Sequence, residues 1–355
     1  MSNDTPILEL RNVEKYFAQK TNILEALLRR QADQIQAVDG VSMAVNENDA
    51  ISVIGESGCG KTTLLHLLIG LYDPTGGEIL YKGTRLSDLD KAGMKAFRRN
   101  VQLIFQDPFN SLDPKLTVEE TLREPLKIHN VGDKEARAKE ILRTVELSPP
   151  EQFLDRLPKQ LSGGEKQRVS IARALILEPD VILADEPVSM LDVSTQASIL
   201  KMLSRMVDEL DVAMVYISHD LSTVSYVSDE INVMYLGRVV EKAPTNDLIH
   251  DPKHPYSQAL IDAIPLPDPH AGRERTDLKG STPEPINLGE GCRFRDRCPE
   301  RMEICERTPR TVQESPERDV ACHLYYDHEE ETPDVDETEP PQMMSDASID
   351  GGRVE

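Results

Sequence analysis

The chain has 355 residues, and its 40 Lys and Arg stand against 63 Asp and Glu, which gives a formal net charge of −23. It contains no run of 18 or more uncharged apolar residues, so no membrane-spanning helix is expected. The first residues lack the basic and then apolar pattern of a secretory signal, so we expect the chain to stay in the cytosol. A surface this acidic repels phosphate backbones, which argues against non-specific nucleic-acid binding.

Part of the negative charge is concentrated at the C-terminus. Residues 326–355 hold eleven acidic residues and one basic residue, Arg353, which leaves −13 for residues 1–325. This segment has little to bury, and we expect a disordered acidic tail. The remaining excess of acid suits either a protein that stays soluble at high salt or an ordinary acidic cytosolic protein, and the composition leaves both open.

Strand-like and helix-like segments alternate along most of the chain. Strands are expected at 7–10, 37–45, 51–54, 181–185 and 212–218, with a helix from Lys61 and another at 194–210. Residues 117–146 show helical periodicity, broken by Pro125 and by a turn at 130–132, and 18–36 is a polar insertion with one helical stretch. The alternation predicts an α/β fold with a parallel sheet and helices on its faces. It stops near Ile264, where PLPDP at 265–269 leads as a linker into a short Cys-bearing segment.

A phosphate-binding motif follows the third expected strand. The segment has the P-loop pattern GxxxxGK[ST], and it consists of Gly55, Glu56, Ser57, Gly58, Cys59, Gly60, Lys61 and Thr62. Such a turn points successive backbone N–H groups at a phosphate, and the helix that follows adds its positive end. Lys61 is placed to bridge the β- and γ-phosphates and Thr62 to hold Mg²⁺. We expect Cys59 to be a filler residue, since no neighbouring His or carboxylate could activate it.

Two carboxylates end the apolar strand at 181–185. Asp185 is placed to hold the Mg²⁺ shell through water, and Glu186 to polarise an attacking water molecule. An apolar strand that ends in two acids is common, and it becomes informative here because a P-loop precedes it.

A second anion-binding turn lies between these two motifs. The sequence LSGGEKQR at 161–168 places Ser162, Gly163 and Gly164 at the start of a helix. This sequence resembles the signature of ABC-type ATPases, and the order of the other motifs agrees with that family. In the family, two ATPase domains pack head to tail, and each ATP lies between the P-loop of one copy and the signature of the other. The resemblance therefore accounts for the second turn.

The resemblance implies roles for further residues. It implies that Thr63 completes the P-loop contacts with ATP, that Gln106 senses the γ-phosphate and Mg²⁺, and that His219 contacts the γ-phosphate. It also implies that Asp192 belongs to the D-loop, in which Met190 replaces the usual Ala, and that Phe17, or its neighbour Tyr16, stacks on adenine. Each could separately be a structural residue, and their occurrence in the expected order favours the functional interpretation.

A particular branch of the family is the most similar. FQDPFNSLDPKLTVEETLREPL at 105–126 and HDPKHPYSQALIDAIP at 250–265 are similar to segments of oligopeptide and dipeptide importers, with a match over roughly residues 5–325. The GESGCGKTT form of the P-loop looks more like the second ATPase of such importers (F-type) than the first (D-type). The resemblance implies a second, paralogous ATPase subunit, two membrane permease subunits and, indirectly, a solute-binding protein as partners, with no nucleic acid. The permease contacts would be Phe105, Phe109, Leu112 and Leu116, which a helical subdomain could equally use as core.

Four cysteines lie close together near the C-terminus, at Cys292, Cys298, Cys305 and Cys322. In a cytosolic chain such a cluster favours metal over disulfides, and four thiolates can hold either Zn²⁺ or an iron–sulfur cluster. The spacing lacks the two-residue separation usual in zinc knuckles. Some ATPases of peptide importers that resemble this segment bind a [4Fe–4S] cluster, which we therefore favour over zinc, with His323 as a ligand only if a cysteine is displaced. We expect its role to be structural.

These observations define one expected architecture and one function. We expect a P-loop NTPase fold of ABC type at 5–264 with a helical subdomain at about 107–178, a C-terminal segment at 265–325 and the acidic tail. The function implied is ATP hydrolysis, with ATP and Mg²⁺, that powers peptide import from the cytoplasmic face of the membrane. The alternatives are the same machinery importing an oligosaccharide or nickel, a soluble ABC protein acting on ribosomes or DNA, or a regulatory ATPase.

Overall fold

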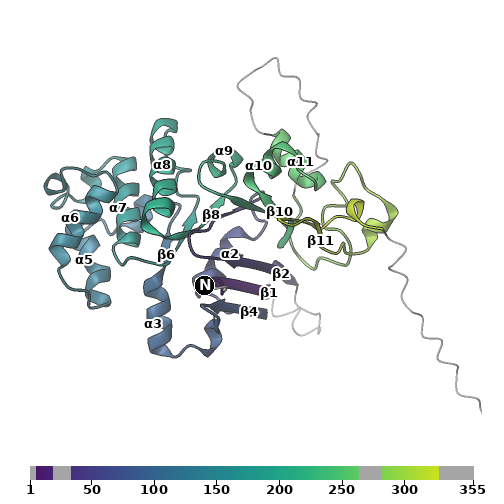
Figure 1. The fold of residues 1–355 in the computed structure, drawn as a ribbon, viewed down its shortest axis with the longest axis horizontal. Coiled ribbons are helices and arrows are strands. Elements are labelled where there is room, and N and C mark those ends of the chain that lie inside the picture. Colours follow the sequence, from purple (N-terminus) through teal and green to yellow (C-terminus); the bar gives the residue numbers. More distant parts are fainter. Residues whose placement is uncertain (1–4, 19–32, 264–281, 328–355) are drawn as a thin grey trace, which may run out of the picture. The chain divides into compact units, whose positions relative to one another are not determined.

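The computed structural model describes residues 5–18, 33–263 and 282–327, and the described chain up to Tyr325 forms one compact unit. Its centre is an eight-stranded sheet in the order β11-β12-β10-β9-β3-β8-β7-β6 (Figure 1). The bounds are β3 Ala50–Ile54, β6 Val101–Ile104, β7 Val181–Asp185, β8 Ala213–Ser218, β9 Glu230–Tyr235, β10 Arg238–Pro244, β11 Val312–Ser315 and β12 Arg318–Val320.

Only five strands of this sheet are parallel. Strands β9, β3, β8, β7 and β6 pair in parallel, as the alternation of strands and helices predicts, whereas β10, β12 and β11 pair antiparallel. The antiparallel part begins with the β9–β10 hairpin, which turns at Leu236 and Gly237, both with positive φ. The expectation of a purely parallel sheet is therefore wrong at this edge.

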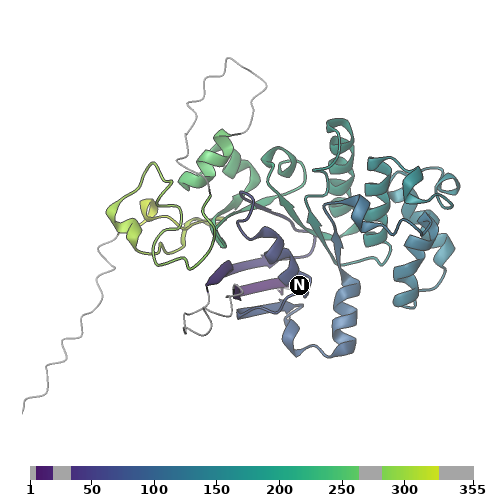
Figure 2. The same cartoon turned by 180° about the vertical axis from the view of Figure 1, so that it is seen from behind.

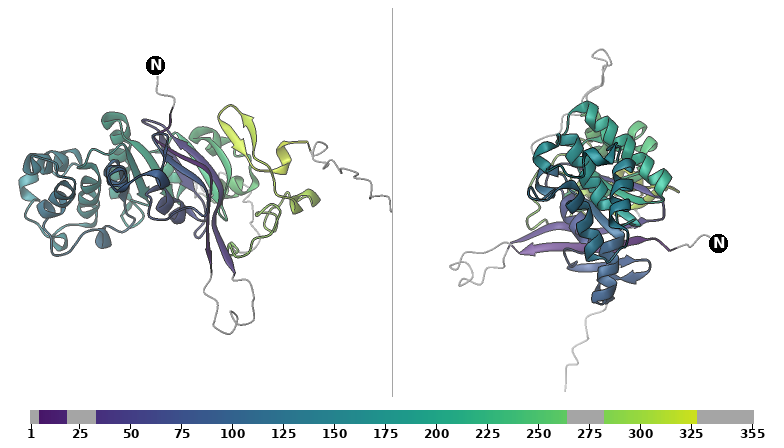
Figure 3. Two further views of the ribbon diagram at one scale, coloured as in Figure 1. Left: turned by 90° about the horizontal axis from the view of Figure 1, so that it is seen from below. Right: turned by 90° about the vertical axis from the view of Figure 1, so that its left-hand side faces the viewer.

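A second, smaller sheet is entirely antiparallel and runs in the order β2-β1-β4-β5. Its strands are β1 Leu8–Ala18, β2 Gln34–Val45, β4 Gly76–Tyr81 and β5 Thr84–Arg85. The expected strands at 7–10 and 37–45 are confirmed and are longer than predicted, and β1 pairs with β2 from Leu8 to Ala18 (Figure 3). The helical stretch expected within 18–36 falls largely outside the described residues.

The helices lie along both faces of the large sheet. They are α2 Lys61–Leu68, α3 Lys91–Asn100, α4 Pro108–Ser111, α5 Val118–Ile128, α6 Lys134–Thr144, α7 Gly163–Leu175, α8 Val193–Leu210, α9 Leu221–Val224, α10 Thr245–His250 and α11 Pro255–Asp262, with short 3₁₀ turns at Leu86–Asp88, Pro150–Gln152, Pro158–Gln160, Glu303–Glu306 and His323–Tyr325. Helices α5 and α6 lie beyond the β6 edge of the sheet, at the opposite end from β11 and β12 (Figure 1, Figure 2). The elements expected at Lys61, 181–185, 194–210 and 212–218 are confirmed.

The break expected at Pro125 is wrong. Pro125 lies inside α5, which ends only at Ile128. The helix begins with a capping box, in which Thr117 Oγ1 accepts from Glu120 N at 3.2 Å and the Glu120 carboxylate accepts from Thr117 N at 2.8 Å. It continues past the proline because Leu122 and Leu126 are both fully buried, so tertiary packing outweighs the lost backbone hydrogen bond. The expected turn at 130–132 is confirmed, since α6 begins at Lys134.

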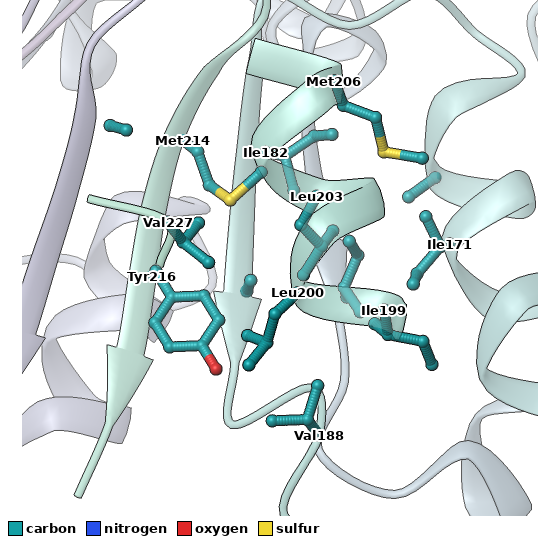
Figure 4. Packing of buried hydrophobic residues seen from close by; sticks show 14 of the residues in the cluster. Ile171, Ile182, Val188, Ile199, Leu200, Leu203, Met206, Met214, Tyr216 and Val227 are labelled. Carbon is teal, nitrogen blue, oxygen red and sulfur yellow. The ribbon is translucent and has the colours of Figure 1, made fainter. Parts of the chain in front are cut away.

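The central strands are buried on both faces. Successive side chains of a strand point to opposite sides, so Ile182 and Met214 join one core with helices α7 and α8, while Leu183 and Val215 join another with α2 and the small sheet. Figure 4 shows the first of these cores, where Leu203 of α8 packs between the strands and the neighbouring helix. Burial of each such side chain stabilises the fold by about 1.5–3 kcal/mol. The two cores hold the strand ends that carry the polar residues in place.

The C-terminal segment extends the large sheet. Strand β12 pairs with β10 through Glu241–Val320 and Lys242–Asp319, and β11 adds outside it. A separate contact joins the segment to the small sheet, because Ile286 forms a β-bridge with Ile35 of β2. The described residues 282–325 are therefore attached to both sheets. The predicted linker at 265–269 lies outside the described residues, and so does the acidic tail from residue 328.

Candidate active site

Most of the predicted nucleotide residues line one cavity of about 730 Å³ at the carboxyl ends of the parallel strands, although Cys59 and Asp185 are not part of its lining. The cavity brings together residues from β3, β6, β7 and β8, which is where ligands bind in open α/β sheets. Its lining comprises Phe17, Ile35, Ala37, Gly55, Glu56, Ser57, Gly58, Gly60, Lys61, Thr62, Thr63, Gln106, Glu186, His219, Leu260 and Pro285. Residues spread over more than 200 positions of sequence thus converge on one site.

The P-loop has the backbone that its glycines allow. Gly60 has a φ of +111°, and a Cβ there would lie 2.0 Å from Ala37 O, so no other residue fits. Lys61 begins α2 and is buried, and its Nζ donates to Gly55 O at 2.7 Å and to Glu56 O at 3.0 Å. These carbonyl contacts hold the ammonium group over the loop, where a phosphate could take their place. Cys59 is 1% exposed and burial raises the pKa of its thiol, in agreement with a packing role.

Glu186 lies between two other polar residues of the cavity lining, Gln106 and His219. Its carboxylate accepts from Gln106 Nε2 at 3.0 Å and lies 2.8 Å from His219 Nδ1. Its φ is +41°, a strained conformation for a side chain other than glycine, and its N–H donates to Ile217 O at 2.9 Å. The strained backbone aims the carboxylate at the cavity while two neighbours orient it. The sequence places these three residues more than 30 positions apart, and the structure brings them into contact.

Asp185 and Thr62 lie on the same edge of the sheet. Asp185 ends β7, and burial, followed by the adjacent Glu186 carboxylate, raises its pKa, whereas the charges of His66 and Lys61 lower it. Thr62 and Gln106 line the cavity itself. A hydroxyl, an amide oxygen and a carboxylate are the oxygen donors that Mg²⁺ prefers, so the donor set fits that ion.

The signature residues and Asp192 do not line this cavity. Ser162 caps α7 in a capping box with Glu165, and Asp192 caps α8, where it accepts from Ser194 Oγ at 2.6 Å and Thr195 N at 3.1 Å. These bonds lower the pKa of Asp192 to about 2. The two caps adjoin, since a Cβ on Gly164 would lie 2.6 Å from Thr195 Cγ2. Of the predicted nucleotide residues, Ser162, Gly163, Gly164 and Asp192 thus form a second polar surface, which does not line the P-loop cavity.

The structure separates the two adjacent aromatic residues. Phe17 lines the cavity and packs edge-on against Tyr72, with ring centroids 5.5 Å apart. Tyr16 instead donates from its hydroxyl to Asp39 Oδ1 at 2.5 Å. The position of Phe17 is therefore compatible with adenine stacking, and Tyr16 has a structural bond of its own.

Two further cavity residues had no signal in the sequence. Leu260 comes from α11 and Pro285 from the C-terminal segment, 25 positions further along the chain. Pro285 is held there by backbone pairing, because its carbonyl accepts from Gln36 N at 2.8 Å. Leu260 lies in the 250–265 segment that resembles peptide importers, but nothing in that segment indicates a contact with the nucleotide site. No local motif marks Pro285, which reaches the site only through long-range packing.

The four C-terminal cysteines are free thiols within one small segment. Cys292 N donates to Cys305 O at 2.9 Å, and three of the thiols are buried while Cys298 is partly exposed. Burial raises the pKa of Cys298 to about 11 and of Cys322 to about 12, and the other cysteines add to both shifts. In the part of the chain that the structure describes, no three His, Cys, Asp or Glu side chains stand as a single metal ion requires. His323 Nε2 lies 2.9 Å from Arg307 O, so that atom is engaged by backbone.

The predicted contact residues after Gln106 divide into two groups. Phe105 and Phe109 are 45% and 57% exposed, and Lys166 Nζ lies 3.9 Å from the Phe109 ring centroid. Leu112 is 3% exposed and belongs to the core, so its assignment to an interface is corrected here. Leu116 is partly buried.

Comparison with known proteins agrees with this geometry. The ABC transporter family matches residues 38–189, and the oligopeptide/dipeptide transporter C-terminal region matches residues 240–305. The oligopeptide transport ATP-binding protein AppF of Bacillus subtilis is 42% identical, over 91% of this chain and 99% of its own. The dipeptide transport ATP-binding protein DppF of Haemophilus influenzae is 40% identical, over 91% and 98%.

Solved structures point to the same class. A dimeric ATP-binding cassette in a post-hydrolysis state, bound to ADP and Pi, is 31% identical with a TM-score of 0.58, and the match covers 67% of this chain and 98% of that one. The fold and cavity thus define an ABC-type P-loop ATPase, which hydrolyses ATP. More narrowly, the chain belongs to the ATP-binding proteins of the oligopeptide/dipeptide transporter family. No helix of the described residues has the length and apolar character needed to cross a bilayer.

Proposed function

We propose that this chain uses Glu186 as the general base for ATP hydrolysis and that hydrolysis drives import of oligopeptides or dipeptides. The observation that carries the catalytic assignment is the Glu186 carboxylate, oriented by Gln106 and His219 on the rim of the P-loop cavity. In this step the water oxygen bonds to the γ-phosphorus as its proton passes to Glu186. The bond to the β,γ-bridging oxygen breaks, and its electron pair leaves on ADP.

The rest of the cavity binds and orients the substrate. Lys61 exchanges its contacts with the P-loop carbonyls for the β- and γ-phosphates, and the backbone N–H groups of residues 57–63 donate to the same phosphates. Thr62, Gln106 and Asp185 would hold Mg²⁺, which supplies positive charge against the phosphate oxygens. Phe17 stacks on adenine from the opposite wall, and His219 contacts the γ-phosphate when ATP is present.

The second polar surface implies a second ATPase subunit. Ser162, Gly163, Gly164 and Asp192 form anion-binding helix starts away from their own P-loop. We propose that they complete the ATP site of a partner subunit, a paralogue of this chain. The solved cassette of similar fold is described as dimeric, which supports this arrangement.

The transported solute is proposed from the relatives. AppF and DppF are described as oligopeptide and dipeptide transport ATP-binding proteins, and both carry the F-type name. The same machinery importing an oligosaccharide or nickel is the alternative within transport. Phe105 and Phe109 are exposed on either side of Gln106 and Asp107 in the chain, which supports the proposal that they contact a pair of membrane permease subunits. We propose that the chain works in this way at the cytoplasmic face of the membrane. A solute-binding protein would act indirectly, through the permeases.

Uptake in the native host tests the transport assignment. A host carrying Glu186→Gln should lose uptake of labelled short peptides while uptake of labelled sugars stays at the level of the parent. Loss of sugar uptake alone would keep the transporter and reject peptides as its solute. Uptake of both solutes at the parental level, in a host whose paralogous ATPase genes have been removed, would reject the transport function and favour a soluble or regulatory ATPase.

We propose that Cys292, Cys298, Cys305 and Cys322 hold a [4Fe–4S] cluster. Four thiols gathered in one segment, none in a disulfide, fit such a group, and a cluster spaces its ligands more widely than a single ion does. The cluster would supply cross-links that a segment with few buried apolar residues lacks, and no step of ATP hydrolysis needs it.

Metal analysis of anaerobically purified protein tests this assignment. The wild-type chain should contain about four iron and four sulfide per chain and absorb broadly in the visible range. Cys298→Ser should lose both, whereas Cys59→Ser, which changes a cysteine outside the segment, should retain them. One zinc per chain without iron would establish zinc as the correct metal instead.

A further inference from the structure

An arginine of the Cys-bearing segment holds the P-loop. Arg297 is 7% exposed, and its guanidinium forms a two-point ion pair with Glu56, at 2.6 Å from Nη1 to Oε2 and 2.9 Å from Nη2 to Oε1. The two residues are 241 positions apart, and Arg297 immediately precedes Cys298. Planar two-point pairs of this kind fix orientation as well as distance.

Glu56 connects Arg297 to the groups that bind phosphate. Its backbone N–H donates to Tyr256 Oη at 2.8 Å, and its carboxylate also accepts from Thr282 Oγ1 at 2.5 Å. Its carbonyl accepts from Lys61 Nζ at 3.0 Å. A shift of Glu56 would therefore move the loop and the lysine that grips the phosphates.

The charge of Glu56 makes the pairing necessary. Its side chain lines the cavity in which ATP brings several negative charges, so an unpaired carboxylate would repel the nucleotide. Arg297 does not line that cavity, and its guanidinium neutralises the Glu56 carboxylate from outside it. Its Nη1 also donates to Thr282 Oγ1 at 3.3 Å and to Tyr235 Oη at 3.4 Å, and within the described residues its buried Nε lacks a hydrogen-bond partner.

The loop that carries Arg297 also contacts β2, another element that lines the cavity. Arg293 pairs with Asp39 of β2 and donates from Nη2 to Gln36 Oε1 at 2.9 Å, next to the cavity residue Ala37. Between the two arginines, Phe294 packs on Tyr235 and Tyr256, with ring centroids 5.3 Å and 5.4 Å apart. The loop from Cys292 to Cys298 therefore contacts two parts of the cavity lining, β2 through Arg293 and the P-loop through Arg297.

We propose that Arg297 is a positioning residue of the ATPase site, which holds the P-loop in its phosphate-binding shape through Glu56 and makes nucleotide affinity depend on the Cys292–Cys298 loop. The proposal rests on the proposed function to the extent that ATP binds at this P-loop. It assigns to the C-terminal region a role in the ATP site of its own chain.

The test measures MgATP affinity and steady-state ATPase kinetics on the purified full-length chain. Arg297→Ala should weaken ATP binding and raise KM at least tenfold, while kcat at saturating ATP stays within about twofold. Adding Glu56→Gln to that variant removes the unpaired charge and should restore most of the affinity. Arg297→Lys keeps the charge without the two-point geometry, and its ATP affinity should lie between that of wild type and that of Arg297→Ala. Arg301→Ala is the matched control, because Arg301 lies in the same segment and pairs only with Asp296 and Glu306 among the described residues.

Three results would count against parts of this account in distinguishable ways. ATP affinity of Arg297→Ala within twofold of wild type would overturn the positioning role. A loss that Glu56→Gln fails to restore, together with a lowered melting temperature, would show that Arg297 merely stabilises the fold. Failure of the wild-type chain itself to bind ATP would reject the proposed nucleotide site, and with it the role of Arg297 that rests on that site.

Discussion

The catalytic rim and the Cys-bearing segment are built in opposite ways. The rim consists of short loops at the ends of strands β3, β6, β7 and β8, with two apolar cores beneath it. In its described part, residues 282–325, the Cys-bearing segment has the short strands β11 and β12 and two 3₁₀ turns, and it attaches itself through long side chains such as Arg293 and Arg297. We therefore expect the catalytic rim to keep its shape when a single side chain is removed. We expect the Cys-bearing segment to depend on each side chain that attaches it to the rest of the chain.

The largest expected effect separates chemistry from folding at the catalytic rim. Glu186→Gln should lower kcat by about 10²–10⁴-fold, since the amide cannot accept a proton from water. ATP should remain bound, and the variant should accumulate as an ATP-bound dimer in size-exclusion chromatography. Its thermal unfolding should match that of wild type. ATP turnover at the wild-type rate would reject Glu186 as the base.

The next effect is on stability and lies in the Cys-bearing segment. Phe294 is 1% exposed and packs on Tyr235, Tyr256 and His254, so Phe294→Ala should cost about 3–5 kcal/mol in the free energy of unfolding. Limited proteolysis should then cut first within residues 282–327. Leu324→Ala, at an exposed position of the same segment, serves as the control and should change stability little. Equal stability of the two variants would show that the aromatic cluster is not an anchor.

The smallest effect distinguishes the two adjacent aromatic residues of β1. Phe17→Ala should weaken ATP binding by about 1–3 kcal/mol, the range found for stacking of a base on an aromatic ring. Tyr16→Phe is the matched comparison, because it removes only the hydroxyl that bonds Asp39 and should cost about 1 kcal/mol of stability with unchanged ATP affinity. Titration with a fluorescent ATP analogue measures both. A larger loss of affinity in Tyr16→Phe would reverse the assignment.

Long apolar segments and contiguous motifs were predictable from sequence. The strand at 181–185 agrees with the structure because burial on both faces leaves a continuous apolar run. The helix at 194–210 was predictable from its one apolar face, and the helix start at Lys61 from the P-loop that precedes it. The β9–β10 hairpin was missed, since β10 carries Arg238, Glu241 and Lys242 and has no continuous apolar run, and the reversal occurs within the short turn at Leu236 and Gly237. Pro125 was misjudged because packing carries α5 past it, and of the two roles left open for Leu112 the core role is the one observed.

By itself, the sequence determined the chemistry of the nucleotide site. The P-loop is recognisable because phosphate binding needs particular residues at close spacing in the chain. Gln106, the signature, Glu186 and His219 lie far apart in sequence and were recognised through the order in which they resemble the motifs of the family. Only the tertiary structure decided what lies behind that site. The pairing of Glu56 with Arg297, the choice of Phe17 over Tyr16 on the cavity wall and the entry of Pro285 into it all join residues far apart in sequence or differing only in side-chain direction. Such contacts follow from how the two sheets pack, and no local pattern of residues encodes them.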